Sequence, residues 1–265
     1  MNISQFIRKT GLIKFADTLR FYYFYCKTYT LRRDFRRQYP GIVLPPPFYM
    51  YETFGLNCFQ FYADSIETAS WLASYFRKYK NGTGLKILDW GCGPGRVVRH
   101  LPGFFDKSCE FYGTDYNKKY VKWCSENIAE AKFANNDLQP PLPYAPATFD
   151  IIYGISIFTH LSEEMHYQWF EELMRVLKPG GILFITLHGN AFKNKLTDSE
   201  RIKFEKGELV VKSKTKEGHR TFAAFQPDSF VKSLAGNHPI REHAAGDAQS
   251  EKPQQDIWIF QKSDG

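Results

Sequence analysis

The sequence has no long apolar run. Its longest aromatic stretch, residues 21–25, is far shorter than the roughly 20 apolar residues that span a membrane. The N-terminal stretch MNISQFIRKTGLIKF contains no continuous apolar segment of the kind that a secretory signal needs. These absences argue against a membrane-spanning or secreted protein.

Cysteine pairs are also missing. The chain has five cysteines, an odd number, and no two of them form a Cys-x-x-Cys pair. Disulfide frameworks and zinc knuckles usually show even numbers or closely spaced pairs. We therefore expect reduced thiols in a cytoplasmic protein.

Acidic residues are scarce in the first fifty positions. That segment has nine lysines and arginines but only two aspartates, whereas the rest of the chain has 26 basic and 26 acidic residues. The net charge of +7 therefore belongs to the N-terminal segment, which ends in YPGIVLPPPFYMY. Consecutive prolines cannot continue a helix or pair in a central strand, so we expect an extended connector there. We divide the chain into a basic aromatic N-terminal cap, 1–58, and a larger domain, 59–265.

From residue 85 onward, apolar runs of strand length alternate with helix-length segments. This alternation is typical of a parallel sheet with helices on both faces. The predicted strands are residues 85–90, 109–115, 131–135, 149–156, 181–189 and 254–262. The predicted helices begin at about residue 94 and cover 117–130 and 162–177. The looser pattern that follows is compatible with a hairpin insertion at about 200–225, with IKFEKGELVVKSK (202–214) as its candidate segment.

A glycine-rich stretch, KILDWGCGPGR, follows the first predicted strand. Glycines allow a tight turn and let backbone N–H groups approach a ligand closely. A dinucleotide loop needs glycine or alanine where this chain has Arg96, and a phosphate loop needs Gly-Lys-Ser/Thr, which is absent. The pattern instead suits a ligand with a ribose and an amino-acid end but no phosphates. The residues that form it are Asp89, Gly91, Gly93 and Gly95.

Acidic residues also follow the second and third predicted strands. Asp115 ends the second strand, 24 residues beyond Gly91, where an acid can accept hydrogen bonds from both ribose hydroxyls. Asn136, Asp137 and Leu138 follow the third strand. An Asn or Asp side chain there can accept a hydrogen bond from an exocyclic amine, and the Leu138 backbone can read a purine ring.

Five stretches in order resemble the motifs of class I S-adenosylmethionine-dependent methyltransferases: ILDWGCGPG, YGTDYN, NNDL, FDIIYGISIFTHL and LMRVLKPGGILFITLHG. The resemblance covers about residues 60–190 strongly and the last strand weakly. It implies a doubly wound, mostly parallel seven-stranded Rossmann-like α/β sheet with an antiparallel last strand, and S-adenosyl-L-methionine as the cofactor. The cofactor-binding residues implied are Asp89, Gly91, Cys92, Gly93, Gly95, Asp115, Tyr116, Asn136, Asp137, Leu138 and Ser156.

Two histidines fall at the carboxyl ends of the predicted fourth and fifth strands, where open α/β sheets bind ligands. A neutral imidazole is a natural base for a hydroxyl acceptor, so His160 and His188 are the candidate catalytic residues. His160 could instead only orient its loop, because Ser162 resembles a helix N-cap. The clustered carboxylates of metal-dependent family members are not seen near these strand ends, so we expect no metal.

The basic N-terminal segment leaves three kinds of partner open. A basic aromatic lid over the acceptor pocket would favour an anionic or sugar-like acceptor. An amphipathic segment within residues 1–40 would favour an anionic membrane surface, to which a cytoplasmic protein would be peripheral. Nucleic acid comes third, because basic charge alone is not specific and the Asn/Asp-Pro-Pro-Tyr motif of amino-methylating DNA enzymes is absent after the fourth strand.

Taken together, these patterns predict a methyltransferase of a small-molecule or glycan-type acceptor, with oxygen as the target atom and a histidine as the base. Two alternatives remain. One is a non-catalytic domain that binds the cofactor or a partner through the same loop. The other is a membrane-associated methyltransferase of a lipid-type acceptor.

Overall fold

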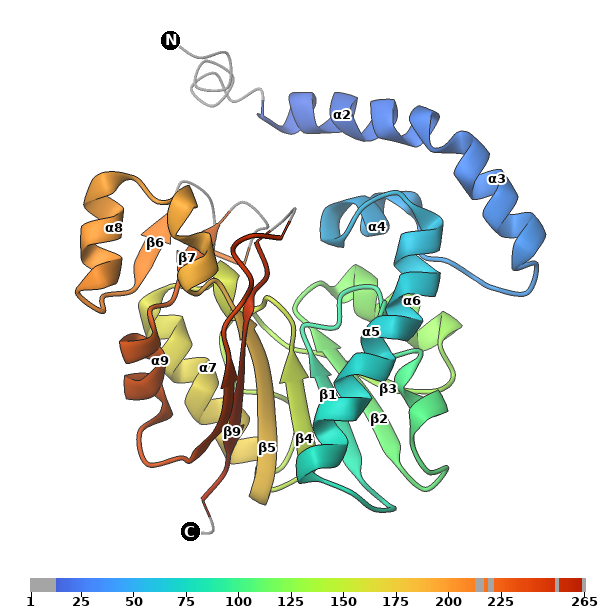
Figure 1. Cartoon of the computed structure of the whole chain (residues 1–265). Helices are drawn as coiled ribbons and strands as arrows, with labels where there is room; N and C mark the ends of the chain where they lie inside the picture. The colour runs from blue at the N-terminus through green and yellow to red at the C-terminus, as the bar shows by residue number, and fades with distance from the viewer. Residues whose placement is uncertain (1–12, 213–216, 219–221, 251–252, 264–265) are drawn as a thin grey trace. The chain divides into compact units, whose positions relative to one another are not determined.

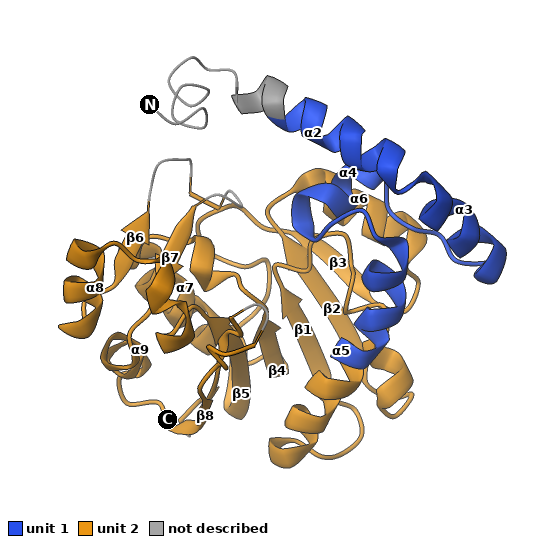
Figure 2. Cartoon of the chain, turned by 45° about the horizontal axis from the view of Figure 1, so that its top comes forward, with its two compact units in different colours: residues 1–68 blue, residues 69–265 orange. Residues whose placement is uncertain are grey.

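The computed structural model describes residues 13–212, 217–218, 222–250 and 253–263, with side chains from residue 17 onward. The chain divides into two compact units, Met1–Thr68 and Ala69–Gly265, which Figure 2 shows in different colours. The boundary falls within the long helix α5 (Cys58–Tyr79). Each unit has a hydrophobic core of its own and is described separately.

The larger unit contains a seven-stranded sheet in the order β3-β2-β1-β4-β5-β9-β8 (Figure 1). The five strands from β3 to β5 run parallel, and β9 pairs antiparallel with both β5 and β8. This arrangement confirms the fold class expected from the sequence, including the antiparallel last strand. The strands are β1 (Lys86–Trp90), β2 (Glu110–Asp115), β3 (Lys132–Asn135), β4 (Phe149–Gly154), β5 (Leu177–Leu187), β8 (Ile240–Ala244) and β9 (Asp256–Gln261).

Both faces of the sheet are buried, because the strands have apolar residues at consecutive positions and not only at every second one. Leu88 belongs to a core cluster with residues of α7 (Glu163–Val176) and α9 (Asp228–Ala235). Its neighbour Ile87 belongs to a second cluster, which includes Leu72 and Phe76 of α5. The α7 helix begins as expected, because the Ser162 side chain accepts a hydrogen bond from Met165 N. A further helix, α6 (Lys118–Asn127), follows β2.

The segment after the glycine-rich stretch differs from the prediction. Instead of an α-helix from about residue 94, the chain forms successive turns up to His100 and then a 3-10 helix, η1 (Leu101–Phe104). Gly93 and Gly95 both have positive φ, 53° and 72°, which is incompatible with a right-handed helix. The regular hydrogen-bond ladder of an α-helix therefore does not start here.

The insertion is also more complex than a hairpin. Residues of the expected hairpin, 202–205, instead form the end of α8 (Asp198–Glu205), whose start is fixed by a capping box between Thr197 and Glu200. The strand β6 (Val210–Lys212) then pairs antiparallel with β7 (Ala223–Phe225), within the expected interval. Residues 213–216 and 219–221, between these strands, lie outside the described residues. Two 3-10 helices, η2 (Phe158–His160) and η3 (Asn190–Lys195), follow β4 and β5.

The smaller unit is helical, with α2 (Ile13–Lys27), α3 (Tyr29–Gln38), α4 (Pro47–Thr53) and the first part of α5. Its core contains Phe35, Met50 and Phe61. The expected extended connector is confirmed only up to Pro46, because α4 begins at Pro47. Proline is tolerated at the first position of a helix, since the N–H that it lacks would have no partner within the helix there. In the described residues no helix combines the length and apolarity needed to cross a membrane.

Candidate functional site

A pocket lies in the larger unit, at the carboxyl ends of β1, β2 and β3 and beside the segment that follows β4. Seven residues expected from the sequence line it, six for the cofactor and one histidine. The lining residues are Trp90, Gly91, Asp115, Tyr116, Asn136, Asp137, Leu138, Ile157, His160, Leu161, Trp169 and Gly218. The other expected residues, Asp89, Cys92, Gly93, Gly95, Ser156 and His188, lie outside this lining.

The glycine-rich loop folds against the end of β2. The backbone N–H groups of Gly91 and Cys92 both donate to the Thr114 carbonyl, each at 2.8 Å. Gly91 has a φ of 77°, and a Cβ at this position would lie 2.2 Å from the Ile157 side chain. A Cβ on Gly95 would lie 2.4 Å from the Ile128 side chain. Glycine is therefore required at these two positions by backbone conformation and by close approach.

Asp115 connects this loop to the pocket. Its Oδ2 accepts a hydrogen bond from Gly93 N at 3.0 Å, and its Oδ1 accepts one from Asn117 N at 2.7 Å. Burial raises the pKa of the Asp115 carboxyl to about 6, and the two backbone donors lower it in part. Each carboxylate oxygen has a second lone pair, so the side chain can still accept hydrogen bonds from a ligand in the pocket.

Asp89, in β1, is 5% exposed. Burial raises the pKa of its carboxyl to about 7, an effect that the Tyr153 hydroxyl and the Arg96 charge partly oppose and the charge of Asp115 increases. Asp89 therefore interacts electrostatically with the Asp115 carboxylate, and the protonation state of one affects the other.

Asn136 carries an unsatisfied buried acceptor. Its side chain is 7% exposed, and Nδ2 donates to the Asp137 carbonyl at 2.6 Å. Its Oδ1 is buried without a hydrogen-bond partner, although most buried polar atoms in folded proteins have one. Asp137, the neighbouring alternative, is exposed. Because Asn136 lines the pocket, a ligand with an N–H group is a fitting partner for this oxygen.

Two residues that line this pocket, Trp169 and Gly218, could not be found from the sequence. Trp169, in α7, donates its indole N–H to the Leu138 carbonyl at 3.0 Å and so fixes the segment after β3. Gly218, from the insertion, accepts a hydrogen bond from the Tyr116 hydroxyl at 3.1 Å and donates its N–H to the His160 carbonyl at 3.0 Å. Trp169 fits the apolar pattern of its helix, and nothing in the local sequence pairs Gly218 with β2.

The rings of His160 and His188 are each held through Nδ1 by a backbone carbonyl. The Nδ1 atom of His160 lies 2.8 Å from the Phe222 carbonyl, and that of His188 lies 3.1 Å from the Ala224 carbonyl. A carbonyl only accepts, so each neutral imidazole carries its proton on Nδ1 and has Nε2 as its acceptor atom. Burial lowers the pKa of His188 to about 4, and the charge of His160 contributes in the same direction. The strand β7 and the residue before it therefore orient both rings.

Ser156 lies at the end of β4 in a left-handed conformation, with a φ of 64°. Non-glycine residues rarely adopt this conformation, and they do so most often near functional sites. Its hydroxyl bonds with Thr159 Oγ1 at 2.9 Å and accepts from Gln255 Nε2 at 2.7 Å. Cys92, within the glycine loop, is 7% exposed and its pKa is raised by contact with Cys124 and by burial, which fits a packing role and not that of a nucleophile.

Comparisons with known proteins agree with this geometry. A family model described as a methyltransferase domain matches residues 87–181, which include the glycine loop, nearly all of β1 to β4 and the beginning of β5. Residues 87–181 therefore match a methyltransferase domain, which agrees with the resemblance found in the sequence. S-adenosylmethionine is the cofactor of such domains, as the sequence predicts.

Curated relatives of this methyltransferase domain differ in their acceptors. A tRNA (carboxymethyluridine(34)-5-O)-methyltransferase from Arabidopsis thaliana is 34% identical over 46% of this chain and 29% of its own length. A malonyl-[acyl-carrier protein] O-methyltransferase from Enterobacter lignolyticus is 28% identical over 38% of each chain. The chain therefore corresponds to less than half of the length of either relative.

Solved structures show the same methyltransferase fold. A protein of Pyrococcus horikoshii has a TM-score of 0.57 at 20% identity, with 86% of this chain and 99% of that chain covered. The magnesium protoporphyrin IX methyltransferase of Synechocystis, solved with bound SAH, has a TM-score of 0.54 at 16% identity, with 93% and 100% covered.

Proposed function

We propose that this protein transfers the methyl group of S-adenosylmethionine to an oxygen of a small-molecule or glycan-type acceptor, with His160 as the base. The observation that carries the proposal is that His160 lines the same pocket as Asp115 and Asn136, with its proton placed on Nδ1 by the Phe222 carbonyl. Its Nε2 is then an acceptor for the proton that a hydroxyl loses during transfer.

The residues of the pocket fit the cofactor. Asp115 would accept hydrogen bonds from the ribose hydroxyls, and the unsatisfied Oδ1 of Asn136 would accept one from the adenine amine. Tyr116 and Leu138 would contact the base, while the loop at Gly91 and Gly93 would lie toward the methionine end. When bound, the cofactor supplies an electrophilic methyl group, and the chain supplies alignment, exclusion of water and the base.

Support for oxygen as the target atom comes from two sources. A histidine with Nε2 as its acceptor suits a hydroxyl, which must lose a proton, and two relatives have names that describe O-methylation. His188 would act as a second polar group on the acceptor side, kept neutral at physiological pH by its lowered pKa.

Transfer of a tritiated methyl group from S-adenosylmethionine tests this proposal. The full chain is incubated with separated pools of small metabolites, glycans, tRNA and lipid vesicles. We expect label in the metabolite or glycan pool, and we expect His160→Ala to lose at least about 100-fold in rate with cofactor affinity kept. His238→Ala, remote from this pocket, is the matched control.

The other outcomes separate the alternatives. Label found only in tRNA would contradict the proposed acceptor and favour the nucleic acid that several curated relatives methylate according to their names. Binding of S-adenosylhomocysteine without transfer to any pool would favour a non-catalytic binding domain.

A peripheral contact with an anionic membrane is a second proposal, on a separate observation. Tyr22, Tyr23 and Tyr29 are each more than half exposed, on helices that also carry exposed Arg33 and Arg37. Amphipathic tyrosines and arginines together suit the interface of an anionic bilayer. Residues 1–12, which contribute to the predicted amphipathic segment, lie outside the described residues.

Vesicle co-sedimentation tests this contact. We expect binding to phosphatidylserine vesicles that is lost on deletion of residues 1–40, and no binding to neutral phosphatidylcholine vesicles. Equal binding of both forms would contradict it.

A further inference from the structure

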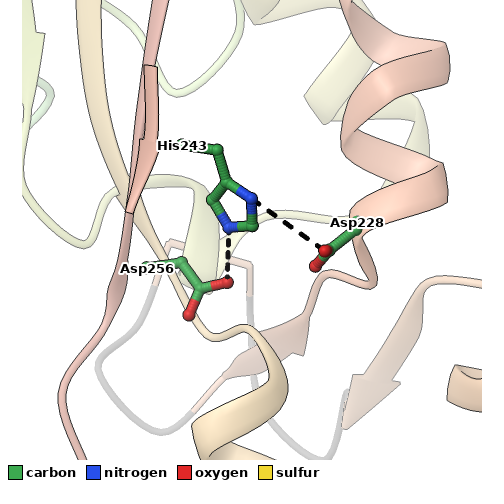
Figure 3. Close-up of side chains that lie close together, drawn as sticks. All are labelled: Asp228, His243 and Asp256. Atoms are coloured by element: carbon green, nitrogen blue, oxygen red, sulfur yellow. Dashed lines mark hydrogen bonds and ion pairs between the residues drawn. The ribbon is translucent and has the colours of Figure 1, made fainter. Parts of the chain in front are cut away.

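A cluster of side chains that can act as metal ligands lies at the carboxyl end of β5, outside the lining of the pocket. Asp228, at the start of α9, His243 of β8 and Asp256, at the start of β9, come from three elements (Figure 3). One ligating atom of each lies within 4.8 Å of the other two. In Figure 3 the His243 ring lies between the two carboxylates, with Nε2 toward Asp256 and Nδ1 toward Asp228.

Both carboxylates are oriented by donors on their outer oxygens. Asp256 Oδ1 accepts a hydrogen bond from Gly246 N at 2.9 Å, and Asp228 Oδ1 accepts one from Asn190 Nδ2 at 3.2 Å. The two Oδ2 atoms face the imidazole, at 3.1 Å from Nε2 for Asp256 and at 3.9 Å from Nδ1 for Asp228. Hydrogen bonds of this kind to the outer side of a ligand orient it toward a metal ion.

The imidazole itself is held before any ion arrives. Its ring stacks on Trp258 with a centroid separation of 3.7 Å and an interplanar angle of 13°. The chain also approaches Asp256 from the other side, because a Cβ on Gly189 would lie 2.0 Å from its carboxylate. Asp256 is 1% exposed, so its position is fixed by packing. Asp228 is about one-third exposed and is the member with room to adjust.

The charge of the cluster is not balanced by basic residues. In the described part of the chain, neither Asp228 nor Asp256 forms an ion pair with a lysine or an arginine; each has only His243 as its ionic partner. Asp256 is buried, and burying a carboxylate without a cationic partner is unfavourable. A divalent cation carries a charge equal and opposite to that of two ionised carboxylates.

We propose that Asp228, His243 and Asp256 bind a divalent transition-metal ion, Zn²⁺ or Mn²⁺. One imidazole nitrogen with two carboxylate oxygens is a donor set that both ions accept, and three protein ligands leave a further position for water. The 3.1 Å separation between His243 Nε2 and Asp256 Oδ2 suits two neighbouring ligands of one ion, and the Asp228 carboxylate, which faces Nδ1, has to turn toward Nε2 to complete the set. The proposal departs from the expectation of no metal, since these residues are 13 to 15 positions apart and show no ligand spacing.

The test uses the full chain, stripped with a chelator and titrated calorimetrically with ZnCl₂ or MnCl₂ at pH 7. We expect one ion per chain and at least a 100-fold weaker affinity in Asp228→Asn and in Asp256→Asn, which keep the side-chain shape and remove the charge. A thermal shift on adding the ion, absent in Asp228→Asn, gives a second readout.

Two controls address other binding groups. Cys26→Ser removes the exposed thiol, which would attract Zn²⁺ but not Mn²⁺, and His238→Ala removes a histidine outside the cluster. Both variants are expected to bind as the wild type does. Absence of stoichiometric uptake by the wild type, or equal uptake by both aspartate variants, would overturn the metal site and leave His243 as the partner of two aspartates only. Should Asp256→Asn fail to fold, the more exposed Asp228→Asn still decides the question.

Discussion

Gln226 pairs with His188 through its backbone and its side chain together. Gln226 N donates to the His188 carbonyl at 3.0 Å, while Gln226 Oε1 accepts from His188 N at 3.1 Å. The other end of the amide, Nε2, donates to the Phe158 carbonyl at 3.2 Å and lies 3.0 Å from His166 Nε2. Gln226 is 1% exposed, and each polar atom of its amide has a partner. One side chain therefore joins the segments that carry His160 and His188.

Replacement of Gln226 by Glu is expected to destabilise the protein. His166 donates its Nδ1 proton to the Ser162 carbonyl, and burial lowers its pKa to about 4, so its Nε2 is an acceptor that needs the Gln226 amide as donor. A carboxylate cannot donate to it or to the Phe158 carbonyl. We expect a loss of about 1–3 kcal/mol in unfolding free energy.

The same variant is expected to change the ¹⁵N chemical shifts of the His160 and His188 rings, which report the tautomer. Gln249→Glu, at an exposed position, is the matched control and should leave both rings unchanged. Unaltered ring signals in Gln226→Glu would show that β7 alone orients the histidines.

The affinity for S-adenosylhomocysteine is expected to depend on the ionisation of Asp115. Its pKa is raised to about 6, so the ionised form that accepts from ribose hydroxyls is lost as the pH falls through 6, and not through its ordinary range near 4. Below pH 6 we expect the dissociation constant to rise about tenfold per pH unit. Calorimetry between pH 5 and 8 measures this.

Asp115→Asn provides the comparison for that titration. It should bind S-adenosylhomocysteine weakly and without the step near pH 6. A step near pH 6 that persists in Asp115→Asn would contradict the assignment.

Asn136 is expected to read the adenine amine through its unsatisfied oxygen. Asn136→Ala should lower the affinity for S-adenosylhomocysteine about tenfold, the value of one hydrogen bond to a buried acceptor. S-inosylhomocysteine, which has a carbonyl in place of the amine, should bind the wild type and the variant equally weakly. A variant that loses affinity for both ligands alike would indicate a structural role instead.

Gly91→Ala is expected to destabilise the protein by about 1–3 kcal/mol. The positive φ accounts for part of this, and contact with Ile157 accounts for the rest. In an Ile157→Ala background the contact disappears, so Gly91→Ala should then be less destabilising. Gly103→Ala, where a Cβ meets nothing within 4 Å, is the control and should change the unfolding free energy by less than about 0.5 kcal/mol. Urea unfolding of the five proteins gives the values, and additive effects would contradict the contact.

The sheet could be predicted because its strands are short apolar runs separated by regular helix-length segments, and both properties are local. Asp115 and Leu138 could be predicted for the same reason, since Asp115 ends β2 and Leu138 lies shortly after β3. The turns after Gly95 were not predicted, because the pattern that suggests a helix there says nothing about the sign of φ at Gly93.

Contacts between residues far apart in the chain could not be predicted from the sequence. Trp169 meets Leu138 across 31 positions, and the Asp228, His243 and Asp256 side chains meet only because β9 inserts between β5 and β8. The His166 side chain, on the predicted helix 162–177, is fully buried against Gln226. Its neighbours Met165 and Trp169 show the apolar face of the helix, yet a histidine on such a face does not reveal its partner.

The strand β7 and the residue before it, Phe222, orient the two histidines from outside the segment that carries the glycine loop. On the proposed function, residues 89–138 would contact the methyl donor, whereas the carbonyls of Phe222 and Ala224, from a different stretch of chain, set the direction of the two imidazoles. During divergence, mutations in the insertion would therefore act first on the acceptor side, and they would reach the methyl-donor side through the hydrogen bond between Gly218 and Tyr116.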